Sequence, residues 1–152
     1  MVTIAKESPD QDDVKALLAQ SDAYSAARYP GESQFLVGVD YLAKPRVRFF
    51  VARDGARVVG CGALVVKQDG RAEIKRMIVD ASARGKGIGW QILEAIEGAA
   101  REAGVSRIRL ETGPESREAL SLYRRAGYRE RGPFSGYPDS PTSIFMEKRV
   151  EG

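Results

Sequence analysis

The chain has 152 residues, of which 43% are hydrophobic and 30% charged, a mixture typical of a single soluble domain spanning residues 1–152. With no histidine and one cysteine, Cys61, the sequence excludes Ser-His-Asp and Cys-His catalysis, an internal disulfide and a zinc site of the usual His/Cys type. No apolar run reaches the roughly 18 residues of a membrane span, and the first residues lack a signal-peptide core. We therefore expect a cytoplasmic protein with no membrane partner.

The net charge of +3 is unevenly distributed along the chain. Residues 1–45 hold four Lys and Arg against seven Asp and Glu, so the remaining residues carry a net +6. A basic body favours an anionic ligand, and nucleic acid is the rival to a small anion. Because the basic residues are interspersed with acids and no basic–aromatic surface pattern is present, we expect no nucleic-acid partner.

In chain order, the first predicted elements are a short strand and a helix that begins at Ser8. Ser8 as the N-cap, Pro9 in the first turn and Gln11 completing a capping box predict this start. The apolar residues that then recur at helical spacing are Val14, Leu17 and Leu18. Residues 23–45 predict two short helices joined by a turn, the second ending before Pro45.

Three strands at residues 48–52, 57–66 and 72–79 are predicted next. Asp54-Gly55 and Asp69-Gly70 separate them and are strong hairpin turn signals. These residues therefore predict an antiparallel meander, in which each strand pairs with the one before it.

The second half of the chain predicts a crossover. A helix over residues 87–103 leads to a strand over residues 107–112, so this strand should be parallel to the last strand of the meander and the crossover right-handed. A helix over residues 115–126 and strands over residues 128–131 and 143–148 complete the sheet. The predicted fold is an α/β mixed sheet with helices on both faces.

The stretch Arg84-Gly85-Lys86-Gly87-Ile88-Gly89 combines three glycines with two cations where the predicted helix begins. Glycines allow successive N–H groups to converge on one anion, and a helix start adds unpaired N–H groups and the positive end of its dipole. A diphosphate suits such a site, and a glycine-rich turn with two solvated cations is the alternative. A Rossmann dinucleotide site is disfavoured, because the G-x-G-x-G spacing lacks the sixth-position glycine.

Two motifs resemble those of the GNAT superfamily of acyl-CoA-dependent N-acyltransferases. Residues 84–89 meet the acyl-CoA loop pattern Arg/Gln-x-x-Gly-x-Gly/Ala, and residues 119–128 meet the family's Ala-x-x-Leu-Tyr-x-x-x-Gly-aromatic run. The resemblance covers most of the chain, most densely residues 72–128, and is greatest to small bacterial members known as generic acetyltransferases. It implies a GNAT-like fold in which the two central parallel strands splay apart.

The resemblance also implies acetyl-CoA as co-substrate and no metal. The pantetheine arm would lie along the strand before the loop, and the loop amides would bind the pyrophosphate. Ser116 stands where many members have an asparagine, and its shorter side chain offers one hydrogen bond to the arm. The residues implied to bind the cofactor are Met77, Ile78, Val79, Arg84, Gly85, Lys86, Gly87, Ile88, Gly89 and Ser116.

Acetyl transfer to an amine needs a base, a donor for the oxyanion and an acid for the departing thiolate. The resemblance implies Tyr123 as the acid, because it corresponds to the family's tyrosine near the sulfur and an ordinary phenol is protonated at pH 7. Glu73 is the implied base; alternatively it is an exposed strand glutamate in an ion pair. Glu111, at the end of the next strand, competes for the role of base. A main-chain N–H near Ile78 is the expected oxyanion donor.

Tyr24, Tyr29, Glu32 and Tyr137, together with Glu111, are expected to line the acceptor side opposite the cofactor. An acidic entrance there would attract a cationic amine. The structural alternative for the residues near the Pro-Gly turn is that they cover an edge of the core.

We therefore expect an enzyme that moves an acetyl group from acetyl-CoA to a primary amine of a small molecule or a peptide, by direct attack in a ternary complex. A non-catalytic acyl-CoA-binding or sensing module with the same fold is the alternative. Dimers are common among GNAT proteins, so the resemblance leaves room for a homodimer.

Overall fold

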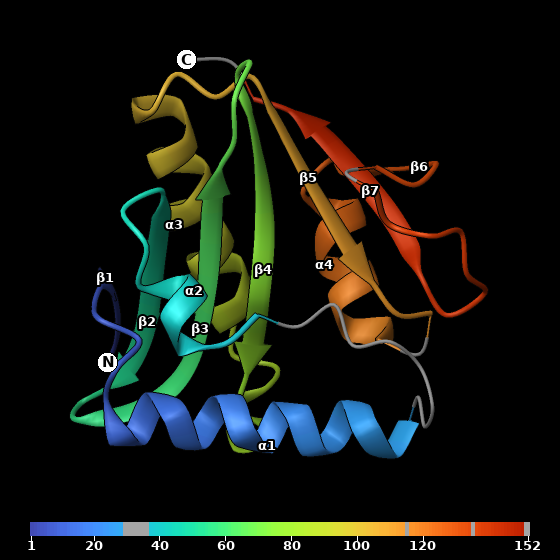
Figure 1. Cartoon of the computed structure of the whole chain (residues 1–152). Helices are drawn as coiled ribbons and strands as arrows, with labels where there is room; N and C mark the ends of the chain where they lie inside the picture. The colour runs from blue at the N-terminus through green and yellow to red at the C-terminus, as the bar shows by residue number, and fades with distance from the viewer. Residues whose placement is uncertain (29–36, 115, 135, 151–152) are drawn as a thin grey trace.

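Seven strands form one sheet in the order β1-β2-β3-β4-β5-β7-β6 (Figure 1). The computed structural model describes residues 1–28, 37–114, 116–134 and 136–150. Neighbouring strands are antiparallel except β4 and β5, which are parallel, so the predicted meander and crossover are confirmed. The strands are β1 Val2–Lys6, β2 Val47–Asp54, β3 Arg57–Val66, β4 Arg71–Val79, β5 Arg107–Thr112, β6 Arg129–Arg131 and β7 Ile144–Arg149.

Helices cover both faces of the sheet, as predicted (Figure 1). One face, called here the α1/α2 face, packs against α1 (Asp12–Arg28) and α2 (Val39–Leu42). The other, the α3/α4 face, packs against α3 (Ile88–Glu102) and α4 (Arg117–Arg125). A short 3-10 helix, η1 (Ala81–Ala83), precedes the glycine-rich stretch. Among the described residues, no helix combines the length and the apolar character that crossing a membrane requires.

The first helix begins later than predicted. The main-chain N–H of Asp10 donates to Oγ of Ser8, and the Gln11 amide donates to the carbonyl of Ser8, so these residues form a turn before α1. The helix then continues unbroken to Arg28 and so includes Tyr24, which was predicted to lie in a turn between two short helices. Of the second predicted helix only α2 is present, and residues 29–36 lie outside the described part of the chain.

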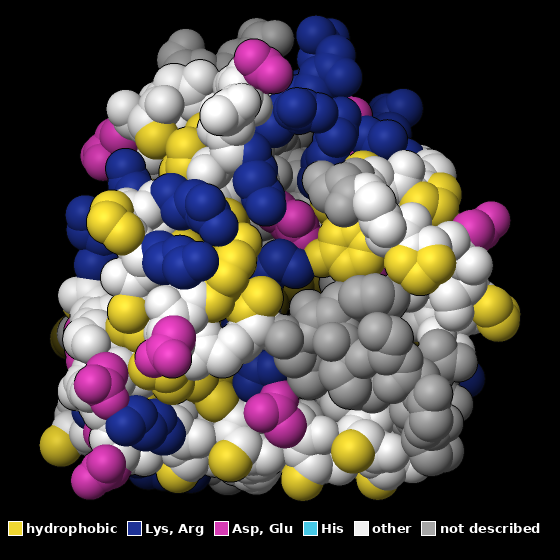
Figure 2. Space-filling view, in the orientation of Figure 1, with side chains coloured by type: hydrophobic (Ala, Val, Ile, Leu, Met, Phe, Trp, Pro, Cys, Tyr) yellow, Lys and Arg dark blue, Asp and Glu magenta, His cyan; other side chains and the backbone are white. Residues whose placement is uncertain are grey.

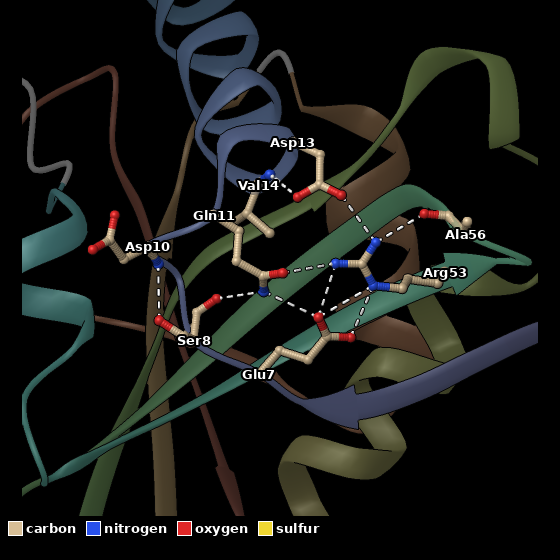
Figure 3. Close-up of polar contacts among 8 residues, drawn as sticks. All are labelled: Glu7, Ser8, Asp10, Gln11, Asp13, Val14, Arg53 and Ala56. Atoms are coloured by element: carbon tan, nitrogen blue, oxygen red, sulfur yellow. Dashed lines mark hydrogen bonds and ion pairs between the residues drawn. The ribbon is translucent and has the colours of Figure 1, made fainter.

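Arg53 explains why the start of α1 is displaced (Figure 3). Its guanidinium group donates to both carboxylate oxygens of Glu7, to Asp13 and to the amide oxygen of Gln11. It also donates to the carbonyl of Ala56 in the β2–β3 turn. The hydrogen bond from Arg53 holds the pKa of Glu7 below its ordinary value, although burial opposes the shift. Gln11, which was predicted to complete the capping box, therefore helps instead to attach the first turn of α1 to β2.

Helix α3 packs directly against β3 at Gly60 and Gly62, two strand residues without a side chain. A Cβ at Gly62 would lie 2.9 Å from Sδ of Met77 and 2.9 Å from Cγ2 of Ile92. A Cβ at Gly60 would lie 2.9 Å from the carbonyl oxygen of Ile78. This contact fixes the beginning of α3 beside the carboxyl end of β4, where the glycine-rich stretch connects them.

The parallel strands β4 and β5 pair only at their amino ends. Residues 71–73 of β4 pair with residues 107–109 of β5, and no later pair is formed between these strands. Figure 1 shows the two strands diverging toward their carboxyl ends, at the bottom of the view. The predicted splay is thus present, and it leaves an opening near the centre of the sheet.

Candidate active site

The glycine-rich stretch forms a cradle of bare backbone at the start of α3. Gly85 and Gly87 have φ values of +79° and +75°, in the left-handed region that favours glycine. Gly87 is the N-cap of α3, and no side chain caps the helix there. A Cβ at either glycine would meet no atom within 4 Å, so the space beside both glycines is open. This arrangement fits the pyrophosphate of a coenzyme A molecule.

The two cations of this stretch are exposed, as the prediction requires. Arg84 is 44% exposed at its side chain and lies 3.8 Å from Glu118 on α4, a separation at which a surface ion pair contributes little. Lys86 is exposed between the two left-handed glycines. Both side chains therefore remain available to an anion bound at the helix start.

A bulge interrupts β4 directly before Ile78 and Val79, two of the residues predicted to lie along the cofactor. Two residues of β4, Arg76 and Met77, face only Gly62 of β3, and Arg76 has a φ of +54°. Such a conformation costs about 1–3 kcal/mol for a residue with a side chain. The Arg76 guanidinium is held by Oδ1 of Asp22 at 2.7 Å and by the carbonyl of Leu18 at 3.1 Å, both on α1. Sequence reasoning did not identify this bulge.

Glu73 lies at the opening and is bound by two donors. Its Oε2 accepts a 2.6 Å hydrogen bond from the phenol of Tyr137 and lies 3.0 Å from Nζ of Lys75. Nζ of Lys75 also lies 2.5 Å from the phenol oxygen, which closes a triangle of polar groups. Glu73 is only 3% exposed, so it forms the ion pair of the structural alternative without being an exposed residue. Sequence reasoning missed Lys75 as a site residue, although alternation along β4 places it on the same face as Glu73.

Glu111 lies on the other side of the opening, at the end of β5. Its Oε2 accepts a 2.9 Å hydrogen bond from Oγ of Ser143. Burial raises the pKa of Glu111, while the hydrogen bond from Ser143 and the charge of Lys75 oppose the shift. The charge of Lys75 therefore acts on both candidate bases, Glu73 and Glu111.

Tyr123 projects from α4 into the core of the α3/α4 face. It is 4% exposed and stacks edge-on against Tyr128, with ring centroids 5.7 Å apart. Burial raises the pKa of Tyr123, so the phenol keeps its proton at neutral pH. The preceding residue, Leu122, would lie 3.1 Å from a Cβ at Gly89, so α4 packs against the first turn of α3. Tyr123 is thereby placed near the cradle.

The remaining predicted residues are more scattered. Met77 and Val79 pack on the α3/α4 face, whereas Ile78 packs on the α1/α2 face. Ser116 caps α4 through its main-chain carbonyl, which accepts from Leu120 at 2.9 Å. Tyr24 is 45% exposed on α1. Tyr29 and Glu32 lie outside the described residues.

A cavity of about 250 Å³ opens on the α1/α2 face beside Glu73. Figure 2 shows Lys and Arg side chains gathered around a hollow over the region where β4 and β5 pair. The described lining of this cavity is mainly positively charged, whereas the entrance expected to be acidic includes Glu32, which lies outside the described residues, so that expectation stays a prediction. Its residues are Lys67, Gln68, Arg71, Ala72, Glu73, Arg109 and Phe134.

Comparisons with known proteins agree with this geometry. The profile of the Acetyltransferase (GNAT) family matches residues 14–128. The chain is 49% identical over 148 residues to an IAA acetyltransferase of Azospirillum brasilense, with 97% of each chain covered. It is 36% identical over 123 residues to the uncharacterized N-acetyltransferase YsnE of Bacillus subtilis, covering 80% of this chain and 82% of that one.

A solved structure from Klebsiella pneumoniae, assigned as an acyl-CoA N-acyltransferase, superposes with a TM-score of 0.84 at 33% identity. The superposition covers 99% of this chain and 98% of that one. The family match spans more than half of the chain and includes the cradle, the bulge and Tyr123. The chain therefore belongs to the GNAT family and is an acetyl-CoA-dependent N-acetyltransferase.

Proposed function

We propose that the protein transfers the acetyl group of acetyl-CoA to a primary amine of a small molecule or a peptide, by direct attack while both substrates are bound. The opening between β4 and β5 carries this proposal, because candidate proton-transfer groups adjoin it from opposite faces. Glu73 and Tyr137 lie on the α1/α2 face, whereas Tyr123 belongs to the core of the α3/α4 face. The amine thus approaches from one face while the sulfur is protonated from the other.

The cofactor would be held by the backbone at the start of α3. The N–H groups of residues 85–89 would bind the pyrophosphate, and Arg84 and Lys86 would add two positive charges. Met77, Ile78 and Val79 would lie along the pantetheine arm, where β4 has lost its pairing to β5. Acetyl-CoA supplies an acyl group that is already activated as a thioester.

Glu73 would remove the proton from the incoming ammonium group, directly or through a water molecule. Tyr137 and Lys75 fix the orientation of its carboxylate through contacts of 2.6 Å and 3.0 Å. Glu111 is the competing base, because the burial that raises its pKa also makes it a better proton acceptor near neutral pH. If Glu73 is the base, its replacement by Gln should abolish turnover, and if Glu111 is the base, the replacement of Glu111 should do so.

Tyr123 would donate its proton to the departing sulfur. The phenol is buried and its pKa is raised by that burial, so it is protonated before the reaction. A main-chain N–H at the bulge, at Met77 or Ile78, would stabilise the negative charge that develops on the carbonyl oxygen. The bulge supports this role because it removes Met77, the neighbour of Ile78, from the regular pairing of β4 with β3.

The experiment is release of the coenzyme A thiol from acetyl-CoA over a panel of amines, amino acids and peptides. IAA belongs in this panel, because the relative from A. brasilense is named for it. We expect acceptor-dependent thiol release, together with a rise in melting temperature when coenzyme A binds the folded state. An unchanged melting temperature at saturating coenzyme A would contradict the cradle. Binding without transfer to any acceptor would contradict the reaction.

A further inference from the structure

We propose that the acceptor is a small amine that also carries a carboxylate, and that Arg71, Lys67 and Arg109 bind this carboxylate in the cavity beside Glu73. The proposal rests on the function proposed above and specifies its acceptor class. It differs from the cationic amine that an acidic entrance would select.

The lining of the cavity has an excess of positive charge. Arg71, Lys67 and Arg109 line it together with a single carboxylate, Glu73. The charge of Glu73 is already balanced by Lys75, whose Nζ lies 3.0 Å away. The ion pair between Arg71 and Asp69 measures 3.6 Å and involves a carboxylate that is 82% exposed, so it neutralises Arg71 only weakly.

Arg109 has a half-buried carboxylate partner, Glu147, but that partner is shared. Oε1 of Glu147 lies 2.7 Å from Nε of Arg109 and 2.8 Å from Nη1 of Arg131, and its Oε2 lies 3.9 Å from Nη1 of Arg107. One carboxylate thus serves three guanidinium groups. The Arg109 side chain is 14% exposed, and such partial removal from water strengthens its attraction for a bound anion.

An aromatic wall adjoins these cations. The guanidinium groups of Arg109 and Arg131 both contact the Phe134 ring, at 5.7 Å and 5.6 Å from its centroid. It also packs edge-on against Tyr137 at 5.3 Å. An apolar portion of the acceptor can therefore lie beside its carboxylate. A cavity of about 250 Å³ suits a single small molecule better than a protein segment.

The spacing along β4 connects this cavity to the reaction. Arg71 and Glu73 are separated by one residue on the same face, a distance of about 6.6 Å along a strand. An acceptor whose carboxylate is bound at Arg71 thus presents an amine a few bonds away to Glu73 and Tyr137. An α-amino acid, or an amino acid with a slightly longer spacing, satisfies both contacts.

The first test compares matched acceptors. Thiol release is measured for the twenty amino acids, β-alanine and γ-aminobutyrate, and for the amide and the decarboxylated form of each active compound. We expect the best acceptor to carry a carboxylate and to lose at least about tenfold in kcat/KM when it is amidated, as for a lost hydrogen bond to a charged group. Spermidine and O-phosphoethanolamine complete the panel.

Each other result has a definite meaning. Preference for an uncharged amine, for spermidine or for O-phosphoethanolamine overturns the carboxylate assignment while leaving acetyl transfer intact. No transfer to any compound, with coenzyme A still raising the melting temperature, contradicts the proposed function instead.

The second test removes single positive charges. Arg71→Gln and Lys67→Gln should raise KM for the carboxylate acceptor by about tenfold or more with little change in kcat, and should leave the KM of its amide unchanged. Lys6→Gln is the matched control, because Lys6 is an exposed lysine on β1, three strands away from β4. An equal change in KM for the acid and the amide, or an equal effect of Lys6→Gln, overturns the proposal. Melting temperatures confirm that each variant is folded.

Discussion

The phenol of Tyr137 donates a 2.6 Å hydrogen bond to Oε2 of Glu73, although 64 positions separate the two residues in the chain. Tyr137 belongs to the loop between β6 and β7, whereas Glu73 lies on β4. Burial and the neighbouring Glu73 carboxylate raise the pKa of Tyr137, so it remains a donor at neutral pH. A loop from the end of the chain thus orients the candidate base at the centre of the sheet.

Glu73→Gln should reduce kcat by about 10²–10⁴, the usual contribution of a general base, and leave the affinity for coenzyme A nearly intact. The amide keeps the shape of the side chain but cannot accept the proton. Thiol release and a thermal titration with coenzyme A separate the two effects. Glu111→Gln is the companion variant, and a loss confined to it would assign the base to Glu111.

The contribution of Glu111 to folding stability should depend on pH. Its pKa is raised above the ordinary 4.5, chiefly by burial, so the folded state binds this proton more tightly than the unfolded chain does. Its contribution therefore favours folding below the ordinary value and is lost as the pH rises through the raised pKa. Relative to the parent, Glu111→Gln should gain stability as the pH increases from 4 to 8, measured by denaturant unfolding at each pH.

Glu7 should show the opposite dependence. The hydrogen bond from Arg53 lowers its pKa, so its contribution to stability is present above the ordinary value of 4.5 and is lost as the pH falls through the lowered pKa. Glu7→Gln should cost about 2 kcal/mol at pH 7, as for hydrogen bonds to a charged group. The difference from the parent should shrink below pH 4.5. A constant difference across this range would refute the assignment.

Tyr123→Phe should lower kcat by about 10²-fold while stability and affinity for coenzyme A stay close to the parent values. Tyr128→Phe is the matched control in the same aromatic pair. The Tyr128 phenol donates a 3.0 Å hydrogen bond to the buried Glu97, so its loss should cost about 1–3 kcal/mol of stability. Equal effects of the two variants on kcat would argue that Tyr123 serves only packing.

Gly87→Ala should weaken coenzyme A binding. The φ of +75° adds a backbone strain of about 1–2 kcal/mol for alanine, and the new Cβ enters the open space over the cradle. Gly98→Ala is the control within α3, where a Cβ also meets no atom within 4 Å. Because alanine favours the helix interior more than glycine does, the free energy of unfolding of that variant should rise by up to about 1 kcal/mol. Isothermal titration with coenzyme A and thermal unfolding distinguish the two results.

Local patterns were sufficient to predict most of the fold. The meander follows from turn signals such as Asp54-Gly55, and the crossover helix follows from apolar residues at helical spacing, because both depend only on residues near one another in the chain. The predicted start of α1 was wrong because that prediction, too, depended only on residues near one another in the chain. Ser8 and Gln11 form a local capping pattern, but Arg53, which is 42 residues from Gln11, binds the Gln11 side chain instead.

The sequence by itself determined the family and the place of the glycine-rich backbone at the start of α3, since short motifs encode both. Only the tertiary structure decided which side chains meet at the opening: Lys75 and Tyr137 at Glu73, and Arg109 with Phe134 at the cavity. It also decided the bulge at Arg76. These contacts depend on the register of β5 with β7 and on where β4 leaves β5, and both are set by packing between segments far apart in the chain.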